Sequence, residues 1–396
     1  MQQFTGLLGI LALLGVAFAL STDRRGVNAR LVVAGVLLQA LLAFLLLRFP
    51  PVVAAFDLLA RGVTKVISFA DEGTRFIFGN LADPSGAWGF VFAVRVLPVI
   101  VFFAALMSVL YHFGVMQRVV AGVAWVIRRV LGVSGAEALS AAANIFVGQT
   151  EAPLTIKPYI GRMTRSQLMA VMTGGFATIA GSVLAAYIGL LGDAYAQALN
   201  LSTDDGRTLF AKHLITASVM SAPAGLVMAK IMLPEREDVP AETLGSLLRE
   251  KPPTRNVLDA ATVGATDGLR LALNVAAMLV AFVALIALIN WPLAALSEQY
   301  HVRTLREQWG VPVLTLQNIL GYVFTPVGWL MGVAWKDAHD VGTLLGQQVV
   351  ATEFVAYLDL ARMSREQQID PRTAQIATYA LCGFANLASI GIQIGG

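Results

Sequence analysis

Charged residues and cysteine are scarce in this chain. Of its 396 residues, 13% are charged and one, Cys382, is a cysteine, whereas soluble domains carry about 25% charged residues. A single cysteine excludes an internal disulfide framework. The sequence also lacks a phosphate-binding glycine loop, a nucleophile elbow and a Cys-x-x-Cys motif, so ATP hydrolysis and acyl transfer have no support. The four histidines lack the spacing of a metal site and are expected at surfaces or interfaces: His112, His213, His301 and His339.

Hydrophobic residues make up 57% of the chain, and the mean hydropathy is +0.70, as is typical of an all-α polytopic membrane protein. The net charge of +3 indicates nucleic acid only weakly, because membrane loops rich in Lys and Arg give the same balance. No nucleic-acid partner is therefore expected. Apolar runs predict spanning helices at 7–20, 31–47, 88–111, 168–191, 209–233 and 256–291.

The remaining segments are less apolar. Interfacial helices are expected within 50–89, 114–132 and 311–333, an external loop at 193–207 and a cytoplasmic linker at 234–255. Arg95, inside the third run, is expected to snorkel or pair near a helix end, without a role in transport. The run 256–291 is too long to stand upright in a bilayer core of about 30 Å, so it must tilt or project.

A polar stretch, Gln149-Thr150-Glu151, interrupts an apolar segment. Gly148 and Pro153 bracket it, which predicts a break in the backbone. Irregular polar backbone is tolerated in a membrane only where protein or a water-filled cavity surrounds it, and an ionisable residue there indicates a functional site. A solvated loop between two core helices is the alternative. Basic residues on both flanks favour a hairpin that enters from the cytoplasm and returns to it.

Two motifs recur in the second half of the chain. Thr150-Glu151 recurs as Thr352-Glu353, 202 residues later (353 minus 151), and the motif at 175–180 recurs at 383–388, 208 residues later (383 minus 175). Three predicted spans separate the halves, so equivalent elements must point in opposite directions. This order predicts an inverted-topology repeat with two re-entrant hairpins and interrupted transmembrane helices, whose tips meet near the midplane. The glycines at 173–182 could alternatively serve close helix packing.

Several motifs together resemble the concentrative nucleoside transporter family. They are GQTEAPLTIKPY, MTGGFATIAGSVL, SAPAGLVMAKIMLPE, NVLDAATVGATDGLRLALNVAAMLVAF, ATEF and CGFANLASIGIQIGG, and the resemblance covers most of the chain from Arg95 onward. It implies a homotrimer in a bacterial inner membrane, in contact with lipid, that takes up nucleosides such as uridine by an elevator mechanism. Family members usually continue with a further spanning helix, whereas this sequence stops at Gly396; it is either cut there or lacks that helix.

The resemblance also implies a division of the chain. Residues 1–112 hold spanning helices of a scaffold, and residues 113–233 form the first repeat. Residues 234–310 contain the cytoplasmic linker and the long scaffold helix, expected at the threefold axis. Residues 311–396 form the second repeat.

The family's site residues carry over position by position. The base would lie against Gly148, Gln149, Thr150, Glu151 and Val183. The ribose, whose hydroxyls a carboxylate binds with charge-assisted strength, would lie against Glu353, Phe384, Asn386 and Ser389. The family's sodium site maps onto Asn144, Val147, Thr178 and Ile179. Of these residues, Thr150, Val183 and Phe384 could instead simply pack.

Alternatives remain open at this point. Sodium is preferred as the coupling ion, but some relatives use protons. A related two-hairpin carrier for another polar solute is possible. So is an intramembrane hydrolase using Glu151, Glu353 and Asp267, although the symmetric repeat argues for transport, because alternating access needs symmetry and catalysis does not. No organic cofactor is expected, and purine or pyrimidine preference is not fixed.

Overall fold

The computed structural model describes residues 2–83, 88, 91–149, 151–237, 254–299, 302–304, 308, 313–387, 389–390 and 393. This described part is nearly all α-helical and contains no β-strand. Among the described residues, five helices are long and apolar enough to cross a membrane: Ala29–Leu47, Phe92–His112, Arg165–Gln197, Thr203–Met232 and Val257–Ser297. The expected class, an all-α polytopic membrane protein, is confirmed.

The N-terminal part begins with helices α1 (Gln2–Ala19) and α2 (Ala29–Leu47), the second capped by the Asn28 side chain. The predicted interfacial stretch 50–89 is largely one 29-residue helix, α3 (Pro50–Phe78), which packs against α2, α5 and α11. The third predicted span is α4 (Phe92–Arg95) followed by α5 (Leu97–His112). The two are separated just before Pro98, a residue that suits the first turn of a helix.

Arg95 pairs near a helix end, as predicted. Its guanidinium lies 3.5 Å from an Asp193 carboxylate oxygen and 4.0 Å from one of Asp71, and it donates to the carbonyl oxygen of Ala82 at 3.0 Å. The buried Arg207 contacts the same two carboxylates, at 2.8 Å for Asp193 and 3.0 Å for Asp71. This network joins the N-terminal helices to the first repeat.

The first repeat starts with α6 (Val115–Leu131), which lies within the predicted interfacial stretch 114–132. Helices α7 (Gly135–Asn144) and α8 (Lys157–Ile160) flank the polar tip, and α9 (Arg165–Ala177), α10 (Gly181–Leu199) and α11 (Thr203–Met232) follow. The predicted external loop 193–207 is wrong. Asp193 lies inside α10, where its ion pairs with Arg95 and Arg207 neutralise its charge. Only residues 200–202 separate α10 from α11.

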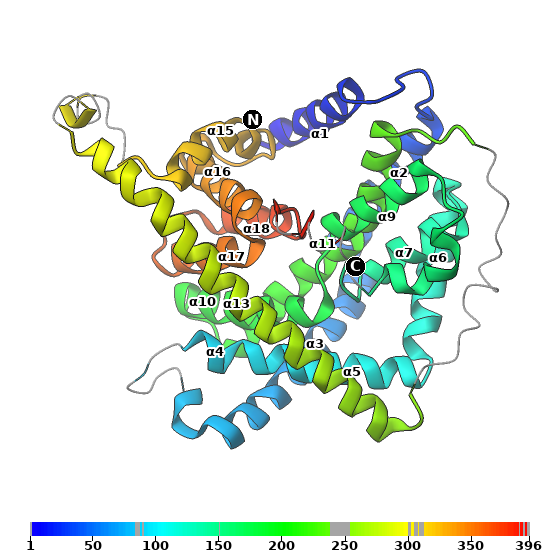
Figure 1. Cartoon of the computed structure of the whole chain (residues 1–396), viewed down its shortest axis with the longest axis horizontal. Coiled ribbons are helices and arrows are strands. Elements are labelled where there is room, and N and C mark those ends of the chain that lie inside the picture. The colour runs from blue at the N-terminus through cyan, green and yellow to red at the C-terminus, as the bar shows by residue number, and fades with distance from the viewer. Residues whose placement is uncertain are drawn as a thin grey trace.

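The long predicted helix is α13 (Val257–Ser297), which extends six residues beyond the expected end at 291 and contains Pro292. Its 41 residues correspond to about 62 Å, and it crosses the whole molecule in the view of Figure 1. One face packs closely on α5, since a methyl group added at Gly264 would lie 2.8 Å from the Cα of Ala105. Most of the large apolar side chains of α13 are exposed.

The second repeat contains α15 (Leu316–Leu330), α16 (Trp335–Val350), α17 (Glu353–Arg365) and α18 (Pro371–Ala380). Their order matches that of the first repeat: the helix expected at the interface, two hairpin helices around a polar tip, then a helix that breaks. Helices α15 to α18 gather on one side of the molecule and α6, α7 and α9 on the other (Figure 1). The expected repeat with two hairpins and interrupted helices is confirmed.

Candidate substrate and ion site

The first hairpin tip turns between α7 and the short helix η2 (Pro153–Ile156). The backbone N–H groups of Glu151 and Ala152 both donate to the carbonyl oxygen of Gly148, at 3.2 and 3.0 Å. A methyl group added at Gly148 would lie 2.6 Å from a carboxylate oxygen of Glu151, so glycine leaves room for that side chain. Gln149 is buried and Glu151 is exposed. Thr150 lies outside the described residues.

The second hairpin tip presents a buried carboxylate. Glu353 is the first residue of α17 and is 5% exposed, and Thr352 caps that helix by accepting from the N–H of Val355. The Glu353 oxygens accept from the Tyr187 hydroxyl at 3.1 Å and from the Asn386 Nδ2 at 2.7 Å. Because a carboxylate offers about four lone-pair positions, these two bonds orient Glu353 and leave accepting capacity free.

The two repeats meet through their polar residues. Gln149 donates from Nε2 to the Ser389 hydroxyl at 3.1 Å, and its Oε1 accepts from Gln393 Nε2 at 2.9 Å. Ser389 in turn donates its backbone N–H to the Asn386 Oδ1 at 2.8 Å. One hydrogen-bonded chain therefore links the first tip, the second helix break and, through Asn386, the Glu353 carboxylate.

Helix α9 and the segment after α18 approach each other closely where the repeated Gly-Phe-Ala motif occurs. A methyl group added at Gly383 would lie 2.6 Å from the carbonyl oxygen of Phe176. One copy of the motif therefore packs against the other.

The apolar part of the site belongs to one hydrophobic core. Val183 is buried and Phe384 is partly buried against that core. The Tyr187 ring lies 5.0 Å from the Phe354 ring, which also contacts Phe92.

The residues of the predicted cation site surround the break between α9 and α10. Thr178 has an extended backbone (φ −124°, ψ 163°) where α9 ends, and its hydroxyl donates to the carbonyl oxygen of Gly174 at 2.9 Å. Asn144 is fully buried, and neither atom of its side-chain amide has a hydrogen-bond partner. A methyl group added at Gly174 would lie 3.5 Å from the Asn144 Nδ2, so the amide lies against the last turns of α9.

Such an arrangement suits a hard monovalent cation. Buried polar groups normally have partners, and the free oxygen of Asn144 beside a helix break is the kind of ligand that unwound transporter helices offer to sodium. Ile179 is buried and Val147 is partly buried. Within the described residues no group of three His, Cys, Asp or Glu side chains could hold a metal ion.

Three further residues were missed from the sequence. Tyr187 lies one helical turn after Val183 on α10, so the i, i+4 rule could have placed it on the same face. Gln393 lies within a motif that carried the family resemblance, but nothing in its spacing indicated a contact with Gln149. Ser218 on α11 donates to the carbonyl oxygen of Ile145, next to Asn144, at 3.0 Å.

A buried charge cluster holds the base of the first hairpin. The Lys230 ammonium lies 2.7 Å from a Glu137 oxygen and 3.3 Å from one of Glu235, and it donates to the Ser166 hydroxyl at 2.9 Å. Burial raises the pKa of Glu235, but hydrogen bonds from Thr164 and Lys230 outweigh it and hold the pKa below its ordinary value. Helix α7 is thereby fixed to α9 and α11.

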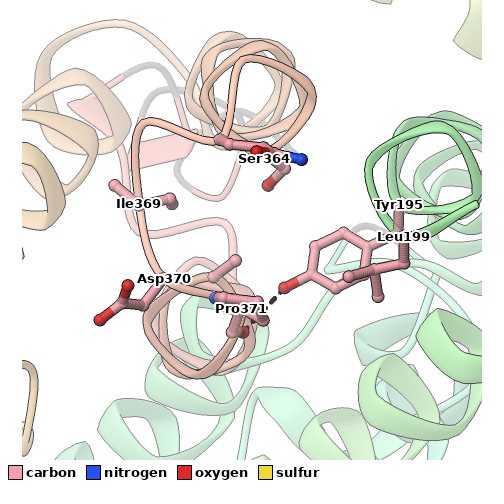
Figure 2. A pocket seen from close by; sticks show the side chains of 8 residues that line it. Tyr195, Leu199, Ser364, Ile369, Asp370 and Pro371 are labelled. Atoms are coloured by element: carbon pink, nitrogen blue, oxygen red, sulfur yellow. Dashed lines mark hydrogen bonds between the residues drawn. The ribbon is translucent and has the colours of Figure 1, made fainter.

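A separate cavity of about 300 Å³ lies between the end of α10 and the loop that joins α17 to α18 (Figure 2). The Tyr195 hydroxyl donates to the carbonyl oxygen of Pro371 there, at 2.7 Å. None of the predicted site residues lines this cavity.

Comparison with known proteins decides the family. Family models described as "Na+ dependent nucleoside transporter N-terminus", "Nucleoside recognition" and "Na+ dependent nucleoside transporter C-terminus" match residues 8–81, 93–194 and 213–396. An uncharacterized transporter of Haemophilus influenzae is 43% identical, and the match covers all of this chain and 89% of the relative. This chain belongs to the concentrative nucleoside transporter family. It is a transporter and not an enzyme, so the alternative function of an intramembrane hydrolase is excluded.

Other members of the concentrative nucleoside transporter family also match this chain in sequence or in structure. Sodium/nucleoside cotransporter 1 of Mus musculus is 38% identical, and the match covers all of this chain and 58% of that relative. The solved structure of CNTnw in an inward-facing substrate-bound state matches with a TM-score of 0.86 and 41% identity, over 100% of this chain and 89% of that one. A CNTnw variant in an outward-facing state matches with a TM-score of 0.85, 41% identity and the same coverage.

Proposed function

We propose that the protein is a sodium-coupled nucleoside symporter whose substrate lies between the two hairpin tips. Membership of the family makes the chain a nucleoside transporter that works by alternating access. The finer proposal concerns which ion drives transport and which residues hold the substrate. The buried Glu353 carboxylate, oriented by Tyr187 on α10 and by Asn386 at the break after α18, is the observation that carries it.

We assign the ribose to the second repeat. A charged carboxylate strengthens each hydroxyl contact to roughly 1.5–3 kcal/mol, against about 1 kcal/mol for a neutral acceptor. Glu353 would accept the sugar hydroxyls, with Asn386 and Ser389 completing the polar side and Phe384 the apolar side.

We assign the base to the first repeat. Gln149 offers both a donor and an acceptor, as the edge of a nucleobase requires, and the apolar Val183 suits the face of the ring. Glu151 and Gly148 form the turn beside them, and Thr150 is assigned to the base on the family resemblance alone.

We assign sodium to the break between α9 and α10. The unpartnered amide of Asn144 and the hydroxyl of Thr178 supply neutral oxygens, and backbone carbonyls at Val147 and Ile179 would add others. A sodium ion bound there would order the first hairpin before the nucleoside binds, because Asn144 ends α7 just before the tip. Neutral ligands favour sodium over a proton.

We further propose a homotrimer in a bacterial inner membrane. The exposed apolar side chains along α13 require lipid or another subunit to cover them, and its length suits a central scaffold. This surface includes Leu273, Val280, Val283 and Leu288.

The ribose assignment is tested by a double cycle of binding affinities. Uridine, its deoxy analogues and a purine nucleoside are titrated into the parent and into Glu353→Gln. The glutamine can keep both protein contacts by accepting from Asn386 and donating to the Tyr187 oxygen. Removing sugar hydroxyls should weaken binding strongly in the parent and much less in Glu353→Gln.

The matched control is Glu366→Gln, a surface residue that pairs with Arg362 at 3.0 Å. It should leave every affinity unchanged. If Glu353→Gln lowers the affinity of all analogues by one common factor, Glu353 does not bind the ribose.

A further inference from the structure

Helix α7 carries two buried polar side chains that have no hydrogen-bond partner. Ser140 and Asn144 are both 0% exposed, and neither the Ser140 hydroxyl nor either polar atom of the Asn144 amide is bonded. The other residues from 138 to 143 are alanine or leucine and belong to one hydrophobic core. Because buried polar groups normally have partners, two neighbouring exceptions on one helix require an explanation.

The two side chains lie on the same face of α7. They are four residues apart, a spacing that brings Cβ atoms on a helix to about 5–6 Å from each other. Glu137, three residues before Ser140, shares a buried lysine with Ser166 at the start of α9. Asn144 lies against Gly174 near the end of α9. Ser140 therefore lies between these two contacts, one helical turn from the proposed sodium site.

Ser140 differs from two comparable serines elsewhere in the helices. The Ser364 hydroxyl on α17 donates to the carbonyl oxygen of Leu360, four residues earlier, at 2.8 Å. Ser221 on α11 donates to that of Ala217 at 2.6 Å. Serine inside a helix often bonds to its own backbone in this way. The Ser140 hydroxyl does not, so its lone pairs and its hydrogen are both available to another group.

The second repeat has no side chain at either position. The offset of 202 residues between the two hairpin tips places Gly342 and Gly346 there (140 plus 202, and 144 plus 202). A methyl group added at Gly342 would meet the carbonyl oxygen of Gly321 on α15, and one added at Gly346 would meet the Leu320 side chain. The polar pair therefore belongs only to the first repeat, which contains the proposed sodium site.

We propose that the Ser140 hydroxyl accepts a hydrogen bond from the NH₂ group of Asn144 when sodium is bound. An amide has an oxygen that accepts and an NH₂ group that donates, and only the oxygen can bind a cation. With the NH₂ group held one helical turn back, the oxygen faces the break between α9 and α10. Ser140 is thus a positioning residue that raises sodium affinity without touching the ion, as the partners of metal ligands do. This inference rests on the proposed sodium site.

Two substitutions of Ser140 separate positioning from packing. Ser140→Ala removes the hydroxyl and favours a helix, so the thermal midpoint without sodium should stay the same or rise. Its sodium concentration for half-maximal binding should rise about threefold to tenfold, as expected for one lost hydrogen bond. Ser140→Thr keeps the hydroxyl but adds a methyl group to a fully buried position. Its midpoint should fall, while its sodium affinity stays near that of the parent.

The measurements are binding of radioactive sodium to the purified protein in detergent and the thermal midpoint at increasing sodium concentration. Uridine affinity at saturating sodium should be the same in the parent and in Ser140→Ala, because the ion itself is still bound there. The matched control is Ser364→Ala, which removes an equally buried hydroxyl from the second hairpin. It should leave the sodium affinity unchanged.

Each outcome decides a different statement. Sodium affinity of Ser140→Ala equal to that of the parent overturns the inference and leaves sodium coupling intact. Loss of sodium affinity in proportion to the loss of thermal midpoint, greater in Ser140→Thr than in Ser140→Ala, also overturns it, because packing would then explain the effect. A parent protein that binds no sodium, and whose midpoint ignores sodium, contradicts the proposed function itself.

Discussion

Thr178 combines two roles at the end of α9. Its hydroxyl donates to the Gly174 carbonyl oxygen, and its lone pairs remain available to a cation. Thr178→Val keeps the shape and removes the oxygen. We expect it to raise the sodium concentration for half-maximal uridine uptake about tenfold or more, which corresponds to about 1.4 kcal/mol, with little change in expression.

The control is Thr378→Val on α18. Thr378 makes the same hydroxyl bond to a carbonyl oxygen one turn earlier, at 2.8 Å, and is equally buried. It should leave the sodium dependence unchanged. An equal shift in both variants would mean that the lost helix bond, and not a sodium ligand, explains the effect.

The polar residues of the two hairpin tips were singled out because they interrupt apolar runs, and the family resemblance added Asn386 and Ser389. Gln149, Glu353, Asn386 and Ser389 are brought together in one network. Tyr187 was missed because an aromatic residue inside an apolar helix looks like core packing, and only the fold reveals that its hydroxyl reaches Glu353.

At the scale of elements, the contact between the two Gly-Phe-Ala motifs depends on Gly383. Gly383→Ala would place a methyl group 2.6 Å from the Phe176 carbonyl oxygen, so the segments must separate. Overpacking of this kind costs about 1–3 kcal/mol. We expect a lower thermal midpoint and weaker uridine binding.

Gly122→Ala on the exposed side of α6 is the comparison, because nothing lies within 4 Å of the added methyl group. It should leave the thermal midpoint unchanged or raise it, since alanine favours a helix. Equal behaviour of the two variants would contradict the close approach of the motifs.

The buried Lys230 fixes α7 to α9 and α11. Lys230→Met leaves the Glu137 carboxylate buried and unpaired, which costs about 3–5 kcal/mol. Lys212→Met removes the more exposed pair with Asp57, 2.9 Å apart, which is worth at most about 1 kcal/mol. Thermal unfolding in detergent should show a much larger loss for the first variant; similar losses would show that the cluster does not anchor the hairpin.

Helix breaks were predicted better than helix ends. Glycine and proline mark the breaks near 148 and 178 because they change the backbone itself. The end of α10 was misplaced because Asp193 looks like a loop residue until Arg95 and Arg207 are seen to neutralise it. The end of α13 was placed too early because Trp291-Pro292 resembles a helix terminus, yet the helix continues to Ser297.

At the scale of the whole molecule, the inverted repeat predicts that the two hairpins open from opposite faces of the membrane. Cysteines placed singly at Arg162 and Arg365, after removal of the buried Cys382 by Cys382→Ser, should react with an impermeant reagent from opposite sides of oriented vesicles. Labelling of both from the same side would contradict the inverted arrangement.

The repeat was predictable because two motifs recur in the same order at nearly equal offsets. The contacts between the halves were not, because residues such as Gln149 and Gln393, 244 positions apart, meet only once the helices are packed.

Sodium-driven accumulation of a nucleoside is the central claim, and uptake into proteoliposomes tests it most directly. Vesicles with an inward sodium gradient should concentrate uridine above the external level, and an equal potassium gradient should not. Asn144→Leu should abolish the accumulation, because it removes the unpartnered amide from the cation site. Uridine uptake that ignores sodium and follows an imposed proton gradient would contradict the account.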